Sequence, residues 1–215
     1  MNPESLYPFL STEPVDSGSV VADVRASTQE KAGEIVALRE SLVDLHGEGL
    51  IRCARQMAAC FQDGGRLFSF GNGGSSTDAR QIEELHVSPP PPHRPLPAVS
   101  LPHDVATVTA LSNDVSFEVV YARQLAALAG ARDIAVGLST SGGSENLLHA
   151  FDEANRRGMM TVGFAGYDGG RMAQARTVDH LFVVPSSSVH RIQEAQTTLY
   201  HVLWELTQTA LCGRL

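Results

Sequence analysis

The chain has few cysteines, no long apolar run and no secretory signal. Its 215 residues include only Cys53, Cys60 and Cys212, and their spacing contains no CxxC pair. This odd set is typical of reduced thiols in or near the core of an intracellular protein. The amino terminus lacks the basic region and apolar core of a signal peptide. No apolar run approaches the ~20 residues that a membrane span needs. We therefore expect a cytoplasmic protein that does not enter a membrane.

Basic residues are also scarce. Sixteen Lys and Arg stand against 24 Asp and Glu, which gives a formal net charge of −8. Direct binding of nucleic acid needs clustered Lys and Arg that neutralise phosphates, so we expect none here. A small anion remains compatible with this charge, because backbone N–H groups can bind it locally.

Short apolar runs alternate with helical segments through most of the chain. The runs are nearly continuous in apolar character, as in strands buried on both faces of a parallel sheet. They cover residues 66–71, 96–101, 133–139, 160–166 and 180–185. The predicted helices cover 75–87, about 104–127, 144–157, about 170–176 and about 190–211. This alternation predicts a single α/β domain, a flavodoxin-like three-layer sandwich with a doubly wound, five-stranded parallel sheet and helices on both faces.

The amino-terminal part divides into a tail and a helical region. Residues 1–25 are rich in Ser, Pro and acidic residues, which predicts a tail or a loosely docked arm. The domain follows at 26–215 and opens with a helical pattern that ends near Gln62. Gly47 and Gly49 are the two places where this pattern could divide into separate helices. The helical region could form an oligomer interface or pack on its own sheet.

Two loops rich in glycine and hydroxyl groups follow the first and third predicted strands. They read "GNGGSS" (71–76) and "STSGGS" (139–144), and both run directly into a helix. Ligands of open parallel sheets bind at the carboxyl ends of the strands. The second loop offers four hydroxyls at a helix amino terminus without Lys or Arg, which suits a reversibly bound phosphate monoester. An alternative is that Ser144 is only an N-cap in an ordinary turn.

Five ordered motifs resemble the sugar isomerase (SIS) domain family. They read "GNGGSSTDA" (71–79), "LSND" (111–114), "GLSTSGGSENLL" (137–148), "GMMTVGFAGYDGG" (158–170) and "RIQEAQTTLYH" (191–201). The branch that they resemble most is phosphoheptose isomerase, which converts sedoheptulose 7-phosphate to a heptose 7-phosphate. A related branch is a DnaA-binding replication initiation protein, which keeps the fold but acts as a binding module.

The resemblance implies a role for each matching residue. The residues implied to bind a phosphorylated sugar are Asn72, Gly73, Gly74, Ser75, Asn113, Asp114, Ser139, Thr140, Ser141, Ser144 and Gln193. Those between 139 and 144 would hold the phosphate. His201 matches a catalytic histidine, and Gln193 and His201 are the candidate metal positions. Family members are homotetramers with sites between subunits, so the resemblance implies a homo-oligomer.

The family pattern breaks on the helix after the first loop. There the family has a zinc-binding His and, four residues later, a Glu that binds zinc and serves as the base. Without a gap, this chain has Gln81 and Leu85 at those positions. If one residue is deleted within the helix, Glu84 becomes the base, although such a deletion rotates the following residues by about 100°. With Gln81 and Leu85 at the ligand positions, the zinc site would be degraded, or rebuilt from other histidines. The histidines that flank this region are His86, His93 and His103, and on the last predicted helix His190 stands where the family has Asp.

Two main functions remain open from the sequence, beside a different isomerisation or lyase step on a related sugar with a rebuilt metal site. One is an aldose–ketose isomerase that acts on sedoheptulose 7-phosphate or a related sugar phosphate, with His201 and Glu84 as its catalytic residues. The other is a non-catalytic phosphosugar-binding or protein-adaptor module. Gln81 and Leu85 favour the module. The retained His201 favours the enzyme, because the replication relative does not keep this histidine, and we lean toward the isomerase.

Overall fold

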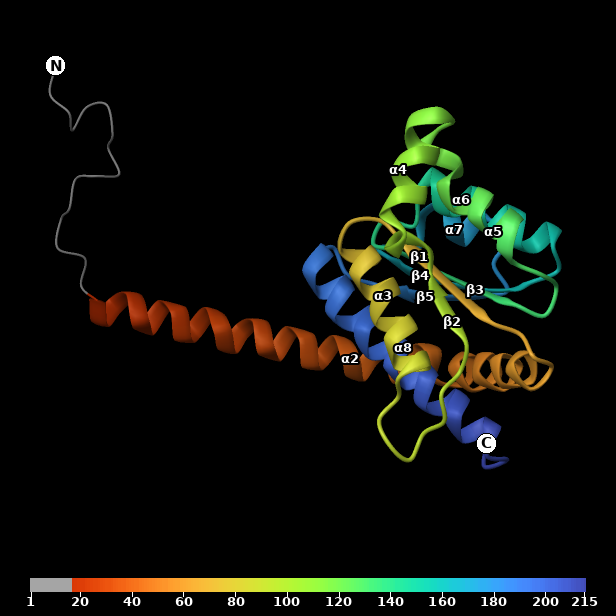
Figure 1. The fold of residues 1–215 in the computed structure, drawn as a ribbon. Helices are drawn as coiled ribbons and strands as arrows, with labels where there is room; N and C mark the ends of the chain where they lie inside the picture. Colours follow the sequence, from red (N-terminus) through yellow and green to blue (C-terminus); the bar gives the residue numbers. More distant parts are fainter. Residues whose placement is uncertain (1–16) are drawn as a thin grey trace, which may run out of the picture. The chain divides into compact units, whose positions relative to one another are not determined.

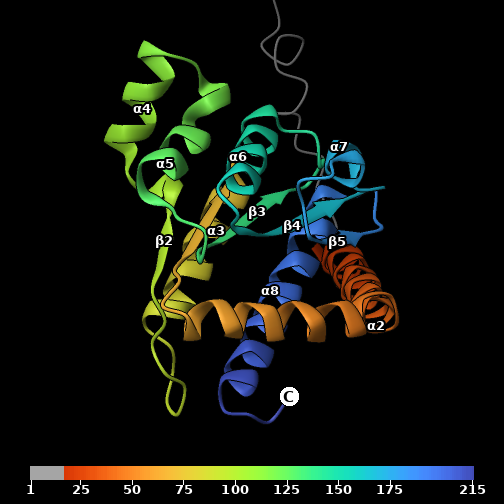
Figure 2. The same ribbon diagram turned by 90° about the vertical axis from the view of Figure 1, so that its right-hand side faces the viewer.

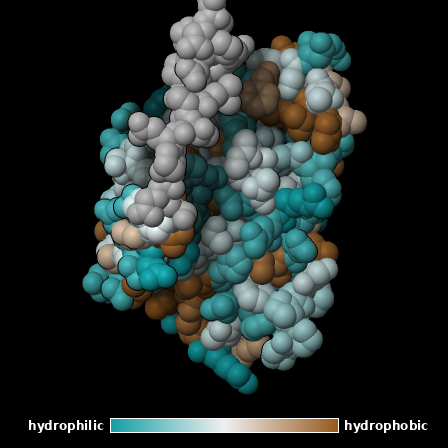
Figure 3. All heavy atoms as spheres, turned by 90° about the vertical axis from the view of Figure 1, so that its left-hand side faces the viewer, coloured by the Kyte–Doolittle hydropathy of each residue, from teal (hydrophilic) through white to brown (hydrophobic). Residues whose placement is uncertain are grey.

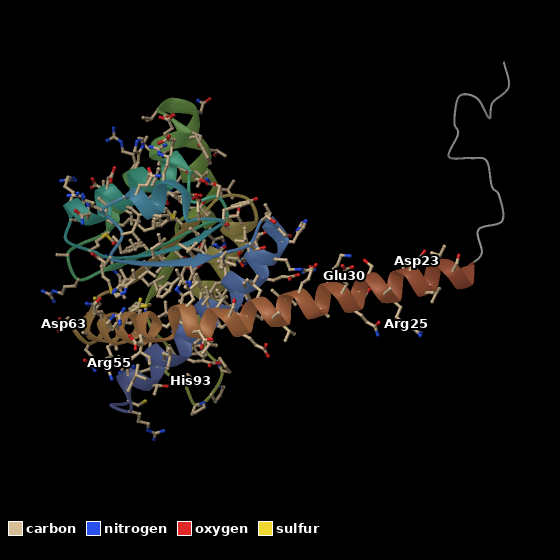
Figure 4. The ribbon with its side chains drawn as sticks, turned by 180° about the vertical axis from the view of Figure 1, so that it is seen from behind. Asp23, Arg25, Glu30, Arg55, Asp63 and His93 are labelled. Atoms are coloured by element: carbon tan, nitrogen blue, oxygen red, sulfur yellow. The ribbon has the colours of Figure 1, made fainter. Side chains whose placement is uncertain are left out.

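The computed structural model describes residues 17–215. The chain divides into two compact units, residues 1–40 and 41–215, which are described separately. The described part of the first unit is helical, and Asp23, Arg25 and Glu30 point away from the helix axis (Figure 4).

The helix that contains this part is α2 (Ser17–Gln62), and it differs from the sequence prediction at two points. It begins at Ser17, inside the segment predicted as a tail or arm; residues 1–16 lie outside the described residues. It also runs unbroken through Gly47 and Gly49, so the predicted division there is wrong. Glycine in a helix interior costs only about 1 kcal/mol relative to alanine, which a long helix tolerates.

The second unit contains a five-stranded sheet in which all neighbours are parallel. Its strands are β1 (Leu67–Gly71), β2 (Ala98–Ser100), β3 (Ile134–Ser139), β4 (Met160–Gly166) and β5 (His180–Val184). Their order is β2-β1-β3-β4-β5. Every residue of β1 and β3 is buried, as the near-continuous apolar runs predict for strands covered on both faces. The predicted doubly wound parallel sheet is confirmed.

Helices cover both faces of this sheet (Figures 1 and 2). They are α3 (Gly74–Val87), α4 (Val105–Asp114), α5 (Val120–Leu128), α6 (Glu145–Arg156), α7 (Gly170–Gln174) and α8 (Val189–Leu211). Within residues 17–215, none of the helices is long and apolar enough to cross a membrane. The single helix predicted at about 104–127 is wrong, because α4 and α5 are separated by a short 3-10 turn, Phe117–Val119. Ser116 causes this break: its backbone is extended, and its hydroxyl accepts a hydrogen bond from the Glu118 N–H at 3.1 Å.

Candidate functional site

The two predicted loops lie side by side at the carboxyl edge of the sheet. Strands β1 and β3 are neighbours, and Gly71 at the end of β1 pairs with Leu138 of β3. After β1 the chain continues to β2 at one edge of the sheet, whereas after β3 it continues to β4 toward the opposite edge. Such a switch point leaves a crevice between the loops that follow the two strands. The topology therefore brings "GNGGSS" and "STSGGS" together.

Three hydroxyls meet in the loop after β3. The Oγ of Ser139 lies 3.4 Å from that of Ser141 and 3.2 Å from that of Ser144, and it accepts a hydrogen bond from the Gly142 N–H at 3.1 Å. Ser144 is the N-cap of α6, but its side chain makes no capping hydrogen bond. Its hydroxyl lies within reach of Ser139 instead, which argues against a purely structural N-cap. The cluster stands at the amino terminus of α6, where free N–H groups favour an anion.

The loop after β4 packs against the loop that carries this hydroxyl cluster. Gly142 has a φ of +64°, and a Cβ at this position would lie 2.1 Å from the carbonyl oxygen of Gly169. The Met172 N–H donates to the Gly142 carbonyl at 2.8 Å. Thr140 is also tightly held, because a Cβ on Gly166 would lie 2.5 Å from the Thr140 carbonyl oxygen. Backbone contacts therefore fix the shape of the loop.

Hydrogen bonds tie the first loop to the helix that begins at the second. The amides of Asn72 and Asn146 exchange two hydrogen bonds of 2.8 Å each. The Tyr121 hydroxyl lies 2.6 Å from the Gly71 carbonyl and 3.3 Å from the Asn72 amide oxygen. Asn72 thus holds the two loops together, and its contact with a sugar remains a prediction. Sequence reasoning missed Asn146 and Tyr121, because only the folded sheet brings them to this loop.

Helix α8 reaches the first loop through Gln193. A Cβ on Gly74 would lie 2.2 Å from the Nε2 atom of Gln193, so this glycine makes room for the amide. Gly73 and Gly74 are exposed, whereas Ser75 is buried. The structure therefore brings Gln193 and the glycine loop together, and their contact with a sugar remains a prediction.

A hydrogen-bonded network joins α3 to the part of α8 that follows Gln193. The Tyr200 hydroxyl lies 3.2 Å from the Asp78 Oδ1 and 2.9 Å from the Gln81 Oε1, and the Thr197 hydroxyl lies 3.5 Å from the same Asp78 oxygen. Asp78 is only 9% exposed. Burial raises the pKa of its carboxyl, while hydrogen bonds from Tyr200 and Thr197 and the charge of His201 oppose that rise. Sequence reasoning missed Asp78, since its spacing does not distinguish it from a solvated carboxylate.

The His201 ring is fixed from two directions. Its Nδ1 lies 2.7 Å from the Thr197 carbonyl, which can only accept, so Nδ1 carries a proton and Nε2 is left available. Its ring stacks on that of Tyr200, with centroids 4.8 Å apart and an interplanar angle of 27°. Among the described residues, no hydrogen bond joins His201 to either loop. It stands eight residues beyond Gln193, a rise of about 12 Å along α8.

Helix α3 is regular, so residues four apart lie on the same face. The helix is unbroken from Gly74 to Val87, and Gln81 faces α8 through its contact with Tyr200. Leu85, four residues later and half-buried, shares that face. Glu84 is exposed, and its carboxylate makes no hydrogen bond or ion pair with any residue between 17 and 215. The role of Glu84 as a base remains a prediction that no contact in the structure supports.

Comparisons with known proteins agree with the motifs. The model of the SIS domain matches residues 32–166. The phosphoheptose isomerase of Aquifex aeolicus is 39% identical over 182 residues, which cover 84% of this chain and 94% of that protein. The chain belongs to the phosphoheptose isomerase family. The isomerase of Desulfovibrio desulfuricans is 42% identical over 172 residues, covering 79% of this chain and 80% of that protein. The solved phosphoheptose isomerase of Neisseria gonorrhoeae superposes with a TM-score of 0.80 at 30% identity, covering 86% of this chain and 99% of that one.

In this member of the phosphoheptose isomerase family, the residues between α3 and α8 do not fit a zinc site. Zinc takes imidazole, thiolate or carboxylate ligands, usually four in all. Here Gln81 is bonded to Tyr200, Leu85 has no donor atom, and His201 offers one ring nitrogen. Within residues 17–215, no three His, Cys, Asp or Glu side chains are grouped so that they could hold a metal ion.

The flanking histidines do not rebuild a metal site. His86 is buried, and the ring of His93 packs against that of Trp204 with centroids 4.7 Å apart. His103 lies 3.7 Å from a glutamate of α3, and His190 is exposed at the start of α8. The family member therefore lacks, in its described residues, the ligand set that the resemblance associates with zinc.

Elemental analysis tests this directly. We expect protein purified without chelator to contain well under one zinc per chain, because Gln81 and Leu85 stand where the resemblance implies an imidazole and a carboxylate ligand. The double variant Gln81→His with Leu85→Glu restores an imidazole and a carboxylate and should take up more zinc than the parent. Near-stoichiometric zinc in the parent would contradict this account of the site.

The buried His86 predicts an acid-sensitive fold. Burial lowers the pKa of His86 from 6.5 to about 4. Because the folded pKa lies below the unfolded value, this contribution to stability is present above pH 6.5 and is lost as pH falls toward 4. We expect the free energy of unfolding to fall by about 3 kcal/mol from this group across that window.

Urea unfolding of the parent and of His86→Leu between pH 7 and pH 4.5 would measure this effect. The parent should lose more stability than the variant over that range, because leucine takes up no proton on unfolding. Parallel curves for the two proteins would show that His86 is not the source of the acid sensitivity.

Proposed function

We propose that the protein binds a phosphorylated seven-carbon sugar and interconverts its aldose and ketose forms. The observation that carries this proposal is the cluster of Ser139, Ser141 and Ser144 at the switch point, in a chain of the phosphoheptose isomerase family. The relatives that match are isomerases by name, which favours this activity over a binding or adaptor module. Sedoheptulose 7-phosphate is the substrate that we propose.

The chemistry requires a base and a group that stabilises charge on oxygen. Isomerisation moves a proton between C1 and C2 of the sugar and passes through an enediolate. His201 is the proposed acid–base residue, because its Nε2 remains free to accept a proton while Nδ1 donates to Thr197. The hydroxyl cluster and the first-turn N–H groups of α6 would hold the phosphate away from the reacting carbons.

We propose that a second copy of the chain completes the site. Asn113 donates a hydrogen bond to Asp114 at 2.8 Å, and both residues are exposed at the end of α4. The surface around them is apolar: Val105, Val115 and Phe117 are 66%, 54% and 50% exposed. Figure 3 shows apolar side chains gathered at the top of the second unit, where α4 lies. Such patches mark protein interfaces, so we propose that the chain forms a homotetramer. Light scattering would measure the mass of this assembly.

We also propose that the protein works in the cytoplasm. Cys53, Cys60 and Cys212 are free in the structure. Burial raises the pKa of the Cys53 thiol, which keeps it protonated and unreactive. Free thiols of this kind persist in reducing compartments.

A turnover assay tests the proposed function. The protein is incubated with sedoheptulose 7-phosphate, with and without added zinc, and the aldose product is followed by NMR. Formation of the aldose in both samples supports the proposal. Binding of the sugar phosphate without any product would contradict it, and would leave a phosphosugar-binding protein without catalysis.

The phosphate loop gives a prediction of its own. Ser141→Ala should weaken binding of sedoheptulose 7-phosphate by about 1–2 kcal/mol, because one hydrogen bond to a charged acceptor is lost. Titration calorimetry would measure this change. Unphosphorylated sedoheptulose is the matched ligand: the parent should bind it poorly, and Ser141→Ala should not alter that weak binding. Equal affinity of the parent for both sugars would exclude a phosphate role for this loop.

A further inference from the structure

Asp78 and Gln81 of α3 form hydrogen bonds with Tyr200 of α8, and the ring of Tyr200 stacks on that of His201. We propose that Asp78 and Tyr200 are positioning residues for His201, on the face of α3 where the resemblance implies metal ligands at positions 81 and 85. The inference rests on the proposed isomerase activity, and it concerns how this chain orients its catalytic imidazole. Figure 1 shows α3 and α8 beside each other on one face of the sheet.

Tyr200 fixes one side of the imidazole. Neighbouring residues of a helix point about 100° apart, yet the rings of Tyr200 and His201 are stacked at 4.8 Å. The tyrosine is only 3% exposed, and its hydroxyl is held within reach of Asp78 and Gln81. A ring that is packed and bonded in this way cannot swing aside. Together with the bond from Nδ1 to Thr197, it sets the direction in which Nε2 points.

The donors and acceptors around Tyr200 decide which group accepts its hydroxyl proton, and they favour Asp78. The Tyr200 hydroxyl has one proton but lies near two acceptors, the carboxylate of Asp78 and the amide oxygen of Gln81. The two ends of an amide are interchangeable in such an assignment. With its amide turned, Gln81 donates to the Tyr200 oxygen while Tyr200 donates to the Asp78 carboxylate, so the one hydroxyl proton of Tyr200 has one acceptor. Aligned bonds of this kind polarise one another. Gln81 therefore has a structural role that requires no metal.

Asp78 is linked to His201 through Tyr200, whose hydroxyl contacts the Asp78 carboxylate and whose ring stacks on the imidazole. In the proposed reaction, a carbon–hydrogen bond of the sugar breaks and its electron pair forms the enediolate. The proton goes to Nε2 of His201 and is then returned to the adjacent carbon, while the hydroxyl proton of the sugar passes from O1 to O2 so that the carbonyl moves from C2 to C1. During that interval the imidazole is cationic, and a buried carboxylate nearby stabilises it.

Four variants separate these roles. Tyr200→Phe keeps the stacked ring and removes the hydroxyl, whereas Tyr200→Leu removes both. Asp78→Asn keeps an acceptor for Tyr200 and removes the charge. Asp152→Asn is the matched control, because Asp152 is an exposed carboxylate on α6.

Kinetics with sedoheptulose 7-phosphate would measure each role. We expect kcat to fall about 10-fold in Tyr200→Phe and Asp78→Asn and about 100-fold in Tyr200→Leu, with KM nearly unchanged, because the interactions act on the transition state. Asp152→Asn should match the parent, and a chelator should leave the parent unchanged. Wild-type kcat in both Tyr200→Leu and Asp78→Asn would overturn the proposal.

A second readout does not depend on turnover. The imidazole proton resonances of His201, assigned by their loss in His201→Ala, should be shifted by the stacked Tyr200 ring. We expect Tyr200→Phe to keep that shift and Tyr200→Leu to abolish it. If the parent shows the shift but no turnover, the proposed function fails while the positioning of the ring is supported. If the resonances are the same in Tyr200→Leu as in the parent, the positioning is overturned even where turnover occurs.

Discussion

Replacing His201 by alanine should lower turnover of sedoheptulose 7-phosphate by at least about 100-fold, the usual contribution of a positioned acid–base group. The imidazole is held by Thr197 and Tyr200 with Nε2 available. Binding of the sugar phosphate should change little, because the hydroxyl cluster proposed to hold the phosphate lies on the loop after β3 and not on α8. Steady-state kinetics and calorimetry would measure the two effects separately.

His190→Ala is the matched control for this experiment. His190 lies on the same helix but is exposed in its first turn. It should retain the parent turnover. If His201→Ala kept more than about a tenth of the parent rate, His201 would not be the principal acid–base residue.

Replacing Gly142 by alanine should remove both stability and ligand binding. Its φ of +64° is strained for any residue with a side chain, and the new Cβ would lie 2.1 Å from the Gly169 carbonyl oxygen. We expect a loss of about 2–4 kcal/mol in the free energy of unfolding, since backbone strain and overpacking each cost 1–3 kcal/mol. The loop must move to relieve the contact, and its hydroxyls then no longer converge on a phosphate.

Gly143→Ala controls for the loss of a glycine in the same loop. A Cβ there would lie 3.8 Å from the nearest atom, the Ser141 Oγ, which is ordinary van der Waals contact. We expect its stability to stay within about 0.5 kcal/mol of the parent, as for most surface changes. Urea unfolding of both variants gives the comparison. Similar stability of Gly142→Ala and Gly143→Ala would mean that the loop is not held as the structure indicates.

Much of the fold could be predicted because its signals are local. Each strand lies within an apolar run, since strands covered on both faces have no polar side to interrupt the run. The hydroxyl loop could also be found, because Ser139, Ser141 and Ser144 lie within six residues of sequence at a helix start. The break between α4 and α5 was missed, because the capping role of Ser116 competes with an otherwise helical composition.

The α3–α8 network could not be predicted from sequence. Tyr200 and Asp78 are 122 residues apart in the chain, and only the packing of two helices brings them together. Gln81 and Leu85 were recognised as departures from the family pattern, but the alternative alignment through Glu84 stayed open. The sequence alone could not choose between the ungapped alignment and the alignment with a deletion, because both are compatible with a helical pattern in α3. The helix is regular, and so Leu85 shares the face of Gln81.

Transfer of a carbon-bound proton is the central claim, and deuterium incorporation tests it most directly. The parent protein, treated with chelator, is incubated with sedoheptulose 7-phosphate in D₂O, and the C1 and C2 positions are followed by NMR. The account predicts formation of the aldose and deuterium at these carbons, both lost in His201→Ala. A bound sugar phosphate that forms no aldose and takes up no deuterium would contradict it.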